Sequence, residues 1–423
     1  MLFQCLCGFQ PIFYSTHPNE EPKNSENNNL ELGNDSPDAI NKNTKGHINL
    51  EMVVPYYGVS NTPLATNDTG CYEIFLNNDW SANILYTDIQ TKQRIYLSSD
   101  LSSNHYSEDD TSWIKNIEGG CSIFTAYDNI YLNLYGTDDK PGCLYKADAN
   151  GQNRTKLLDF DKYSAITGAV ASDGDYLYTI STGSDRNKYI IRINIANGDI
   201  EELLELPESR AFLNSAFDDC IIIKMISDQK STDLENPIEM YKNQVHKVYK
   251  YSLTDNSFSE IYQWKQDLLM ESYAHKNLYC FDVSGDCLIM INMENGEQKM
   301  LIPSLSNAGI DSGELMSVLN VYDNHILFEM FDDSLYAIDL DSCNLIKIES
   351  LQDSYSNPYI IGEYGTDFLV TVGNLEVPMD DTAPDGSPII TNVIMDNLAV
   401  IDKDDYWNSI HNFENIKNVF LED

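Results

Sequence analysis

The sequence predicts an all-β chain that folds as a single β-propeller of seven four-stranded blades, behind a disordered N-terminal leader. Three observations support this fold class. A short strand ending in a polar residue recurs along the chain, a turn and a second strand follow most copies, and another strand precedes most of them. The copies are ILYTD at Ile84, LYKAD at Leu144, IIRIN at Ile190, VYKYS at Val248, LIMIN at Leu288, LYAID at Leu335 and LAVID at Leu398.

The seven copies begin 40 to 63 residues apart, which suits units of four short strands joined by loops of variable length. Antiparallel sheets of this size bury both faces when they stack radially around an axis, as in a propeller. A helical solenoid is excluded because the strands follow a period of two and are rich in Tyr, Ile and Val. A two-domain sandwich would not explain seven copies of one hairpin.

The polar residue at the end of each copy has three interpretations, which the stretch CLYKADANGQNRTKLL from Cys143 illustrates. Asp148 and Asn150 could begin a cation loop, Asn153 begins a glycosylation sequon, or the residues serve turn chemistry alone. The equivalent of Asp148 is Ser252 in another copy, and the sequon is not repeated at matching places. We therefore expect a short side chain that caps its own turn.

Composition indicates a globular chain: 42% of its 423 residues are hydrophobic and 22% are charged. The 67 acidic residues outnumber the 26 basic ones, for a formal net charge of -41. Such a charge repels phosphate backbones and anionic headgroups, so we expect no nucleic-acid partner. No apolar run approaches the roughly 18 residues of a spanning helix, which leaves a lipid anchor as the expected route to a membrane.

The N-terminal region divides into residues 1–17, read as the remnant of a lipoprotein signal, and 18–49, a flexible leader rich in Asn, Glu, Pro and Ser. The propeller is expected to occupy residues 50–423. Cys5 and Cys7 are candidates for lipid attachment, although Gln4 and Leu6 are not the small residues that attachment prefers, and an ordinary N-terminus is the alternative.

The nine cysteines form no CxxC pair and no Cys/His cluster, which argues against structural zinc or a disulfide framework. Cys280 and Cys287 are one exception, because they flank FDVSGD and a hairpin centred near Ser284 would set them opposite each other. Either a disulfide or two buried free thiols would follow.

The segments LYKADANGQNRTKLLDFD, GAVASDGDYLYTIS, IIRINIANGDIEELLELPES, AFDDCIIIKMI and LAVIDKDDYW are similar to TolB-like and related extracytoplasmic propeller repeats. Over nearly the whole chain, the sequence resembles uncharacterised propeller lipoproteins of gut Firmicutes. The resemblance implies an extracytoplasmic, lipid-anchored propeller without implying an activity. The family often has a Cys- and His-bearing segment after the first blade. Here His105 remains, but Ser98, Ser103 and Asp110 stand at the cysteine positions, which argues against a disulfide or metal role for that segment.

One rim of the predicted propeller is expected to form the functional surface. In each blade the D-to-A and B-to-C connections share a rim, and the three long connections, Ser98–Glu118, Ser227–Lys247 and Gly373–Asn397, all fall on it. The C-to-D turns on the other rim are expected to be short. Loops that lengthen on one face of a scaffold usually bind a ligand, whereas neutral insertions would scatter over both rims.

The rim candidates are acidic and aromatic. They are Tyr106, Glu108, Asp109, Asp110 and Trp113 in the first loop and Asp380, Asp381 and Asp385 in the last. Carboxylates could bind Ca²⁺, and DTAPDG at Asp381 is similar to the start of a calcium loop. The loop has Ala383 where an acidic ligand is expected and Asn392 where a Glu should close it, so a solvated acidic loop is the alternative. The aromatic residues could stack on a sugar or peptide, or could simply pack.

Function is predicted as non-catalytic: an extracytoplasmic, monomeric propeller that binds a glycan, peptide or protein through this rim, with calcium as the only cofactor considered. The alternative is a secreted hydrolase or lyase that acts on glycans through rim carboxylates. No HxH, HExxH, GxSxG or phosphate-loop arrangement favours a particular reaction.

Overall fold

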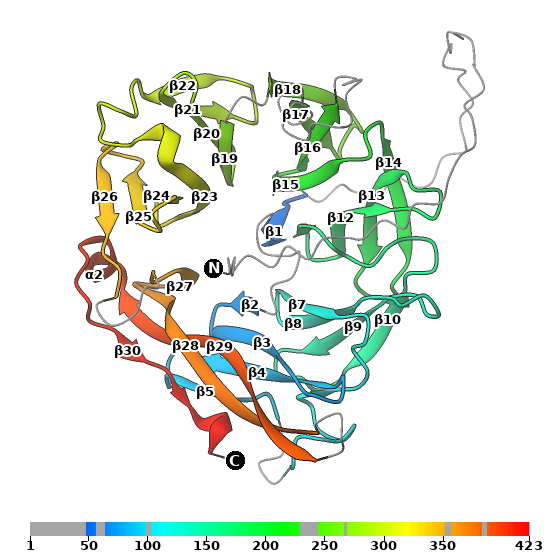
Figure 1. The fold of residues 1–423 in the computed structure, drawn as a ribbon. Helices are drawn as coiled ribbons and strands as arrows, with labels where there is room; N and C mark the ends of the chain where they lie inside the picture. Colours follow the sequence, from blue (N-terminus) through cyan, green and yellow to red (C-terminus); the bar gives the residue numbers. More distant parts are fainter. Residues whose placement is uncertain are drawn as a thin grey trace, which may run out of the picture. The chain divides into compact units, whose positions relative to one another are not determined.

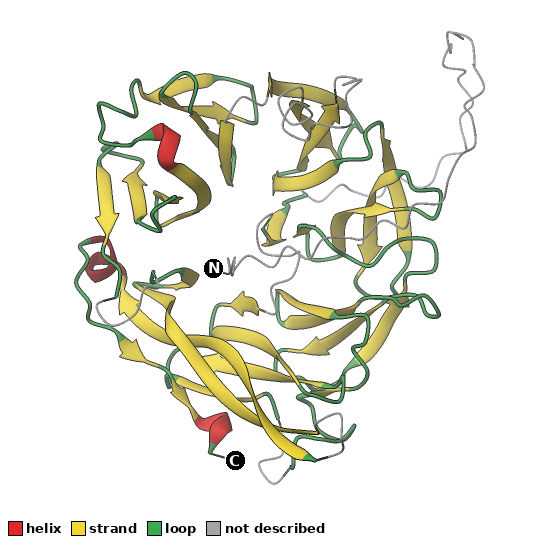
Figure 2. Ribbon diagram, in the orientation of Figure 1, coloured by secondary structure: helices red, strands yellow, loops and turns green. Residues whose placement is uncertain are grey.

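The computed structural model describes residues 48–55, 64–98, 103–228, 244–265, 269–351, 357–382 and 387–422. From Asn49 onward the chain forms one compact unit, in which seven antiparallel sheets follow one another around a ring (Figure 1). Strands and the turns that join them make up most of this unit, and the described residues include three short helices (Figure 2). The seven-bladed, all-β prediction is confirmed.

Each blade contains four consecutive strands, A to D, from the centre outward. Blade 1 has β2 (Leu64–Asn67), β3 (Gly70–Leu76), β4 (Ala82–Asp88) and β5 (Gln93–Tyr96); blade 2 has β7 (Cys121–Ala126), β8 (Asn129–Leu134), β9 (Cys143–Asp148) and β10 (Thr155–Asp159). Blade 3 has β11 (Val170–Ser172), β12 (Tyr176–Thr182), β13 (Lys188–Asn194) and β14 (Ile200–Leu206); blade 4 has β15 (Ala211–Phe217), β16 (Cys220–Asp228), β17 (Gln244–Ser252) and β18 (Phe258–Lys265). Blade 5 has β19 (Leu269–Ala274), β20 (Asn277–Asp282), β21 (Cys287–Asn292) and β22 (Gln298–Ile302); blade 6 has β23 (Leu315–Tyr322), β24 (His325–Met330), β25 (Leu335–Asp339) and β26 (Leu345–Ile348). Blade 7 has β27 (Ile360–Tyr364), β28 (Asp367–Thr382), β29 (Pro388–Asp402) and β30 (Glu414–Asn415).

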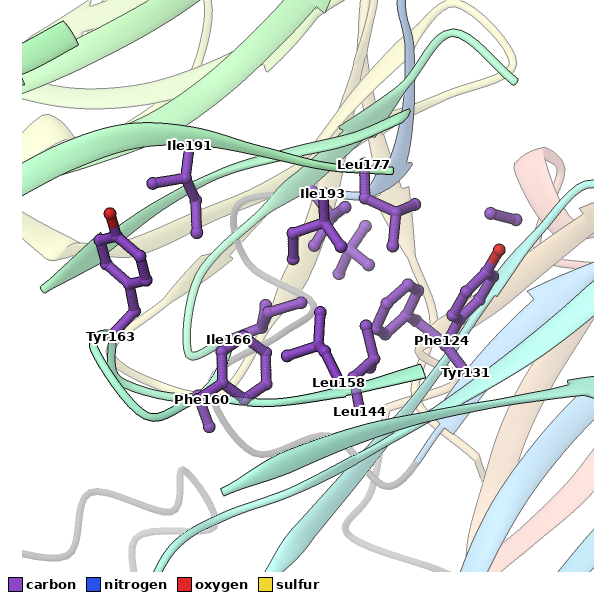
Figure 3. Close-up of a cluster of buried hydrophobic side chains, with 14 of the residues drawn as sticks. Phe124, Tyr131, Leu144, Leu158, Phe160, Tyr163, Ile166, Leu177, Ile191 and Ile193 are labelled. Atoms are coloured by element: carbon purple, nitrogen blue, oxygen red, sulfur yellow. The ribbon is translucent and has the colours of Figure 1, made fainter. Parts of the chain in front are cut away.

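The recurring motif is strand C of every blade, and its apolar residues fill the spaces between blades. Figure 3 shows one such cluster, in which Phe124 and Leu144 of blade 2 face Leu177, Ile191 and Ile193 of blade 3. Burying each such side chain contributes about 1.5–3 kcal/mol. Because each sheet packs on two neighbours, a blade is stable only within the ring.

The polar residue that ends strand C caps the following turn, as expected, in six of the seven blades. The side chains of Asp88, Asn194, Ser252, Asn292, Asp339 and Asp402 each accept a main-chain N–H from two or three residues later. Asp148 differs, because its carboxylate accepts from the Asn153 side chain, at 2.6 Å, while Asn150 caps the turn.

The strand β1 (Glu51–Val54) was not predicted. It pairs antiparallel with β11 and becomes a fifth, innermost strand of blade 3. The main-chain N–H of Leu50 donates to Asp218 of blade 4 at 2.7 Å, and the side chains of Leu50 and Val54 are buried.

The C-terminal tail returns from blade 7 to blade 1. Strand β31 (Lys417–Asn418) pairs parallel with β5, and the 3-10 helix η2 (Val419–Leu421) follows it. Phe420 lies 5.9 Å, between ring centroids, from both Phe75 and Tyr96 of blade 1. The tail thus joins the last blade to the first.

Blade 7 departs from the predicted loop lengths in two ways. Most of Gly373–Asn397 is not a loop, because β28 and β29 remain paired from Asn374–Asp396 out to Thr382–Pro388 after a bulge at Thr371–Asn374. The C-to-D connection is not a short turn, since it holds the helix α2 (Lys403–Trp407), whose Tyr406 and Trp407 pack against Phe368. Burial of these two aromatic rings explains why this connection is longer than its counterparts.

The alignment expected for Cys280 and Cys287 is wrong. In the hairpin of β20 and β21, Cys280 lies opposite Ile289 and Cys287 lies opposite Asp282, so the two cysteines are offset by two residues, and both thiols are free. The turn is centred one residue further along than the sequence suggested. None of the helices that the structure describes is long and apolar enough to cross a membrane.

Candidate functional site

Asp110 of the first predicted loop is a buried anchor for that loop. One carboxylate oxygen accepts from the main chain and the hydroxyl of Ser112, both at 2.7 Å, and the other accepts from Ser98 at 2.9 Å and lies 2.9 Å from Nδ1 of His105. Burial alone would raise the pKa of Asp110, but hydrogen bonds, among them those from Ser103 and Ser112, outweigh it and lower the pKa to about 2. This carboxylate is buried, and its hydrogen bonds hold the loop in place.

The other residues of this loop divide between packing and exposure. Trp113 starts the short strand β6 (Trp113–Ile114), which pairs with β4, and its main-chain oxygen accepts from Nη1 of Arg154 at 2.5 Å. Tyr106 and Asp109 are exposed, and Glu108 forms an exposed ion pair with Lys115 at 2.8 Å. Tyr106 and Asp109 are therefore the predicted residues best placed to meet a partner.

The pair of His105 and Asp110 resembles part of a catalytic relay, because a carboxylate at Nδ1 orients an imidazole for proton transfer. A nucleophile would have to lie at the other ring nitrogen. Within the described ranges, the hydroxyls of Ser98 and Ser112 bond to the carboxylate instead, and the imidazole stacks on Tyr96 with ring centroids 4.1 Å apart. The contacts support an anchoring role.

The predicted residues of the last loop lie partly outside the residues that the structure describes. Asp380 and Asp381 lie in β28, opposite Ile390 and Ile389, but their side chains and the whole of Asp385 lie outside the described residues, as do Cys5, Cys7 and most of Ser227–Lys247. The calcium hypothesis for that loop thus stays a prediction. In the part of the chain that is described, no group of three or more His, Cys, Asp or Glu side chains could hold a metal ion.

A cavity that the sequence did not point to lies on the same rim, between blade 6 and the connection that leads into it from blade 5. Its volume is about 230 Å³. We call it the blade 6 pocket; its lining residues are Gly309, Ile310, Asp311, Glu314, Phe328, Met330, Asp332, Tyr336 and Leu345. Phe328 and Ile310 belong to the buried cluster between blades 5 and 6, so the floor of the pocket is continuous with the core.

Hydrogen bonds from the preceding blade fix the wall of the pocket. Asp286, in the B-to-C turn of blade 5, accepts from Ser304 at 2.7 Å and from the main chain of Ser306 at 2.9 Å. The main-chain N–H of Phe331 donates to the main-chain oxygen of Glu314 at 2.8 Å, which joins the connection to the B-to-C turn of blade 6. The pocket is therefore bounded by hydrogen-bonded turns on both sides.

Three carboxyl groups lie at the border of this apolar floor: Asp311, Glu314 and Asp332. Asp311 caps the 3-10 helix η1 (Ser312–Glu314) by accepting from Gly313 at 3.1 Å. Hydrogen bonds from the main chain and hydroxyl of Ser334 hold the pKa of Asp332 below its ordinary value, so it is ionised at neutral pH. Phe331, beside Asp332 in the chain, is 63% exposed. An apolar floor with an anionic border suits a cationic side chain that has an apolar stem.

Sequence reasoning missed this pocket because it depends on residues from a connection, a turn and three strands of blade 6. The one available signal was the connection from Pro303 to Glu314, which is longer than a tight turn and carries Asp311 and Glu314 beside Ile310. It was shorter than the loops on which the prediction concentrated.

The fold and the site define a β-propeller protein. No family model and no curated protein matches the chain. Among solved structures, it is similar to the β-propeller domain of the Trilobed protease from Pyrococcus furiosus, at 10% identity over 85% of this chain and 97% of that one, with a TM-score of 0.47.

Two further solved structures are an oligogalacturonate lyase in complex with manganese and a puromycin hydrolase mutant. The lyase is 12% identical over 83% of this chain and 85% of its own, with a TM-score of 0.44. The hydrolase is 10% identical over 78% of this chain, with a TM-score of 0.46, and the match spans 58% of the hydrolase's length. Likenesses this distant carry no argument about activity.

Proposed function

We propose that this β-propeller is a binding module that captures a peptide segment or protein partner through a lysine or arginine side chain seated in the blade 6 pocket. The observation that carries the proposal is the combination of an apolar floor and three border carboxyls in one cavity of about 230 Å³. Ligand pockets for drug-sized molecules occupy about 300–1,000 Å³, so this one suits a single side chain.

The chemistry of the lining matches the two parts of such a side chain. The methylene stem would contact Phe328, Met330 and Leu345, whose atoms line the floor. The charged end would reach Asp311 and Glu314, where hydrogen bonds to carboxylates are stronger than neutral ones. The exposed ring of Phe331 would meet an apolar neighbour in the bound segment.

The charge of the whole chain supports the same class of partner. A net charge of -41 accelerates encounter with a cationic partner and repels anionic ones. Because this attraction acts through solvent, it should weaken as salt shortens the screening length. The resemblance to extracytoplasmic lipoproteins supports a location outside the cytoplasm, with Cys5 or Cys7 as the anchor.

The test is a peptide array in which each Lys- or Arg-containing sequence has a Glu-substituted twin, combined with mass spectrometry of the peptides for cleavage. We expect the wild-type protein to bind the cationic members. The double variant Asp311→Asn, Glu314→Gln should lose about tenfold in affinity or more, since each charged contact is worth about 1 kcal/mol. Asparagine keeps the oxygen that caps η1.

The matched control removes two exposed carboxylates from the opposite rim through Asp68→Asn and Asp341→Asn, and we expect its binding to match the wild type. Equal loss in both variants would show that net charge alone drives binding and would overturn the pocket assignment. Cleaved peptides would support the hydrolase alternative.

A further inference from the structure

The extended part of β29 has an open edge. On the side away from β28, only Ala399 and Val400 of this strand pair with another described strand, β30. The main-chain oxygen of Leu398 accepts from Ile416 at 2.9 Å, and that of Asp396 accepts from Arg94 at 2.9 Å. From Pro388 to Met395, no such partner is present among the described residues.

The direction of the free main-chain groups follows from strand alternation. The oxygens of Asp396 and Leu398 point away from β28, and alternate residues of a strand point the same way. Ile390, Asn392 and Ile394 therefore present their N–H and C=O groups on the open edge. Pro378 of β28 lies opposite Asn392, which agrees, because proline fits only where no N–H is needed between the two strands.

The side chains along this edge are apolar and exposed. Ile390 is 72% exposed and Ile394 66% exposed, whereas Val393 and Met395, on the opposite face, pack onto the core beside blade 1. Two large isoleucines on an open edge strand form a pairing surface that soluble proteins usually cover or block with charge.

We infer that this edge is a dimer interface, in which β29 pairs antiparallel with β29 of a second copy across a two-fold axis at Asn392. Ile390 would then lie opposite Ile394 of the partner subunit, and Asn392 opposite the partner's Asn392. All three residues present their main-chain groups outward, so the pairing forms about six hydrogen bonds. The four isoleucines meet on one face. This departs from the monomer that the sequence suggested.

The charge pattern selects a second copy as the occupant. Residues 388–395, PIITNVIM, contain no ionisable side chain, although the chain carries a net charge of -41. The two copies of β29 can thus pair without opposing carboxylates within this strip, and Asp396 falls opposite the partner's Pro388. On the neighbouring strand β28, Glu376 accepts a hydrogen bond from the Asn392 side chain at 3.0 Å, so its charge lies beside the pairing and contributes to the repulsion. The remaining charge still repels at longer range, so we infer an association that strengthens with salt.

The experiment is sedimentation equilibrium at low and high salt, about 50 and 500 mM, where the screening length shortens from about 14 to 4 Å. A strand-pair interface is small, so we expect a dissociation constant of about 1–100 μM. The expected mass approaches twice the 48.0 kDa of one chain at high protein concentration, and more so at high salt. A 48.0 kDa mass under all conditions would overturn the proposal.

Edge variants locate the interface. Asn392→Pro removes one outward N–H and leaves the β28–β29 ladder intact, and it should be monomeric, whereas Asn392→Thr keeps the N–H and should still dimerise. A dimer that survives in Asn392→Pro would place the contact elsewhere and overturn the assignment.

Cross-linking tests the register of the proposed β29–β29 pairing without removing any main-chain N–H from the edge. With a short bis-maleimide, Asn392→Cys should form a covalent dimer, because position 392 faces its own copy. Ile390→Cys alone should not, while Ile390→Cys combined with Ile394→Cys should. Mass spectrometry of the linked peptides separates these products from those of native thiols, and efficient cross-linking of Ile390→Cys alone would contradict the register.

Discussion

Arg94 of blade 1 donates a hydrogen bond from Nη1 to the main-chain oxygen of Asp396 in blade 7, over 2.9 Å. The same guanidinium is fully buried and forms an ion pair through Nη2 with Glu73 of β3. Strand β31, which follows blade 7, pairs with β5 of blade 1, so this side chain closes the ring together with β31 and Phe420 of the tail. Closure of the propeller thus depends on a polar contact as well as on packing.

Replacing Arg94 with alanine should destabilise the protein strongly. Burial raises the pKa of Glu73, and Arg94 opposes that rise, so the variant leaves an uncompensated carboxyl group in the core. Breaking a buried pair by removing one partner costs about 3–5 kcal/mol in the free energy of unfolding. Urea unfolding followed by tryptophan fluorescence measures the loss.

The control is Lys115→Ala, which breaks the exposed pair with Glu108 and should leave the urea midpoint unchanged. If both variants unfold at the wild-type midpoint, Arg94 does not secure the closure.

Asp110 should make stability depend on pH in the acid range. Its pKa is lowered from 3.8 to about 2 in the folded protein, so the carboxylate favours folding above pH 3.8 and this contribution is lost as the pH falls toward 2. A shift of this size corresponds to about 2 kcal/mol. We expect Asp110→Asn to be less stable than the wild type by about that amount near pH 6 and by much less near pH 2.

The two pH values avoid the isoelectric point, near 4.2, where solubility is lowest. Asp109→Asn, an exposed neighbour in the same loop, is the control and should follow the wild type at both values. A constant difference between Asp110→Asn and the wild type would contradict the assigned role.

Asn194 should contribute more to the free energy of unfolding than Asp148, although the two residues occupy the same position in the sequence repeat. Asn194 accepts from the main chain of Ala196 at 2.8 Å and of Asn197 at 3.2 Å, whereas Asp148 bonds only to the Asn153 side chain among its described side-chain contacts. Asn194→Ala should cost about 1 kcal/mol of unfolding free energy, and Asp148→Ala clearly less. Equal losses in thermal unfolding would show that the repeat position, and not the individual hydrogen bonds, sets the stability.

The fold was predictable because its signals are local. A polar cap, an Asn/Gly turn and an alternating strand lie within one hairpin, and seven repetitions leave few architectures that bury both faces of every sheet. The site was less predictable, because Asp110 sits in an acidic run that reads as a surface, and its burial depends on Ser98 and Ser112. Strand β1 depends on pairing with a segment far away in the sequence, and the blade 6 pocket depends on how a connection packs against the strands of the following blade. The chain offers no local pattern for either.

Strand β1 should contribute to stability out of proportion to its length. It pairs with β11 through Glu51, Met52 and Val54. The side chains of Leu50 and Val54 are buried, and Val54 belongs to the apolar cluster between blades 2 and 3. A variant that begins at Pro55 would leave the inner edge of blade 3 open and lose both side chains, at a cost of about 3 kcal/mol or more. A variant that begins at Ile48 keeps the strand and should unfold like the full chain. The decisive measurement is hydrogen exchange at the main-chain N–H groups of Ala171 and Ser172. Protection that is lost only in the shorter variant would assign the effect to the missing strand. Unchanged protection would show that blade 3 is complete with four strands.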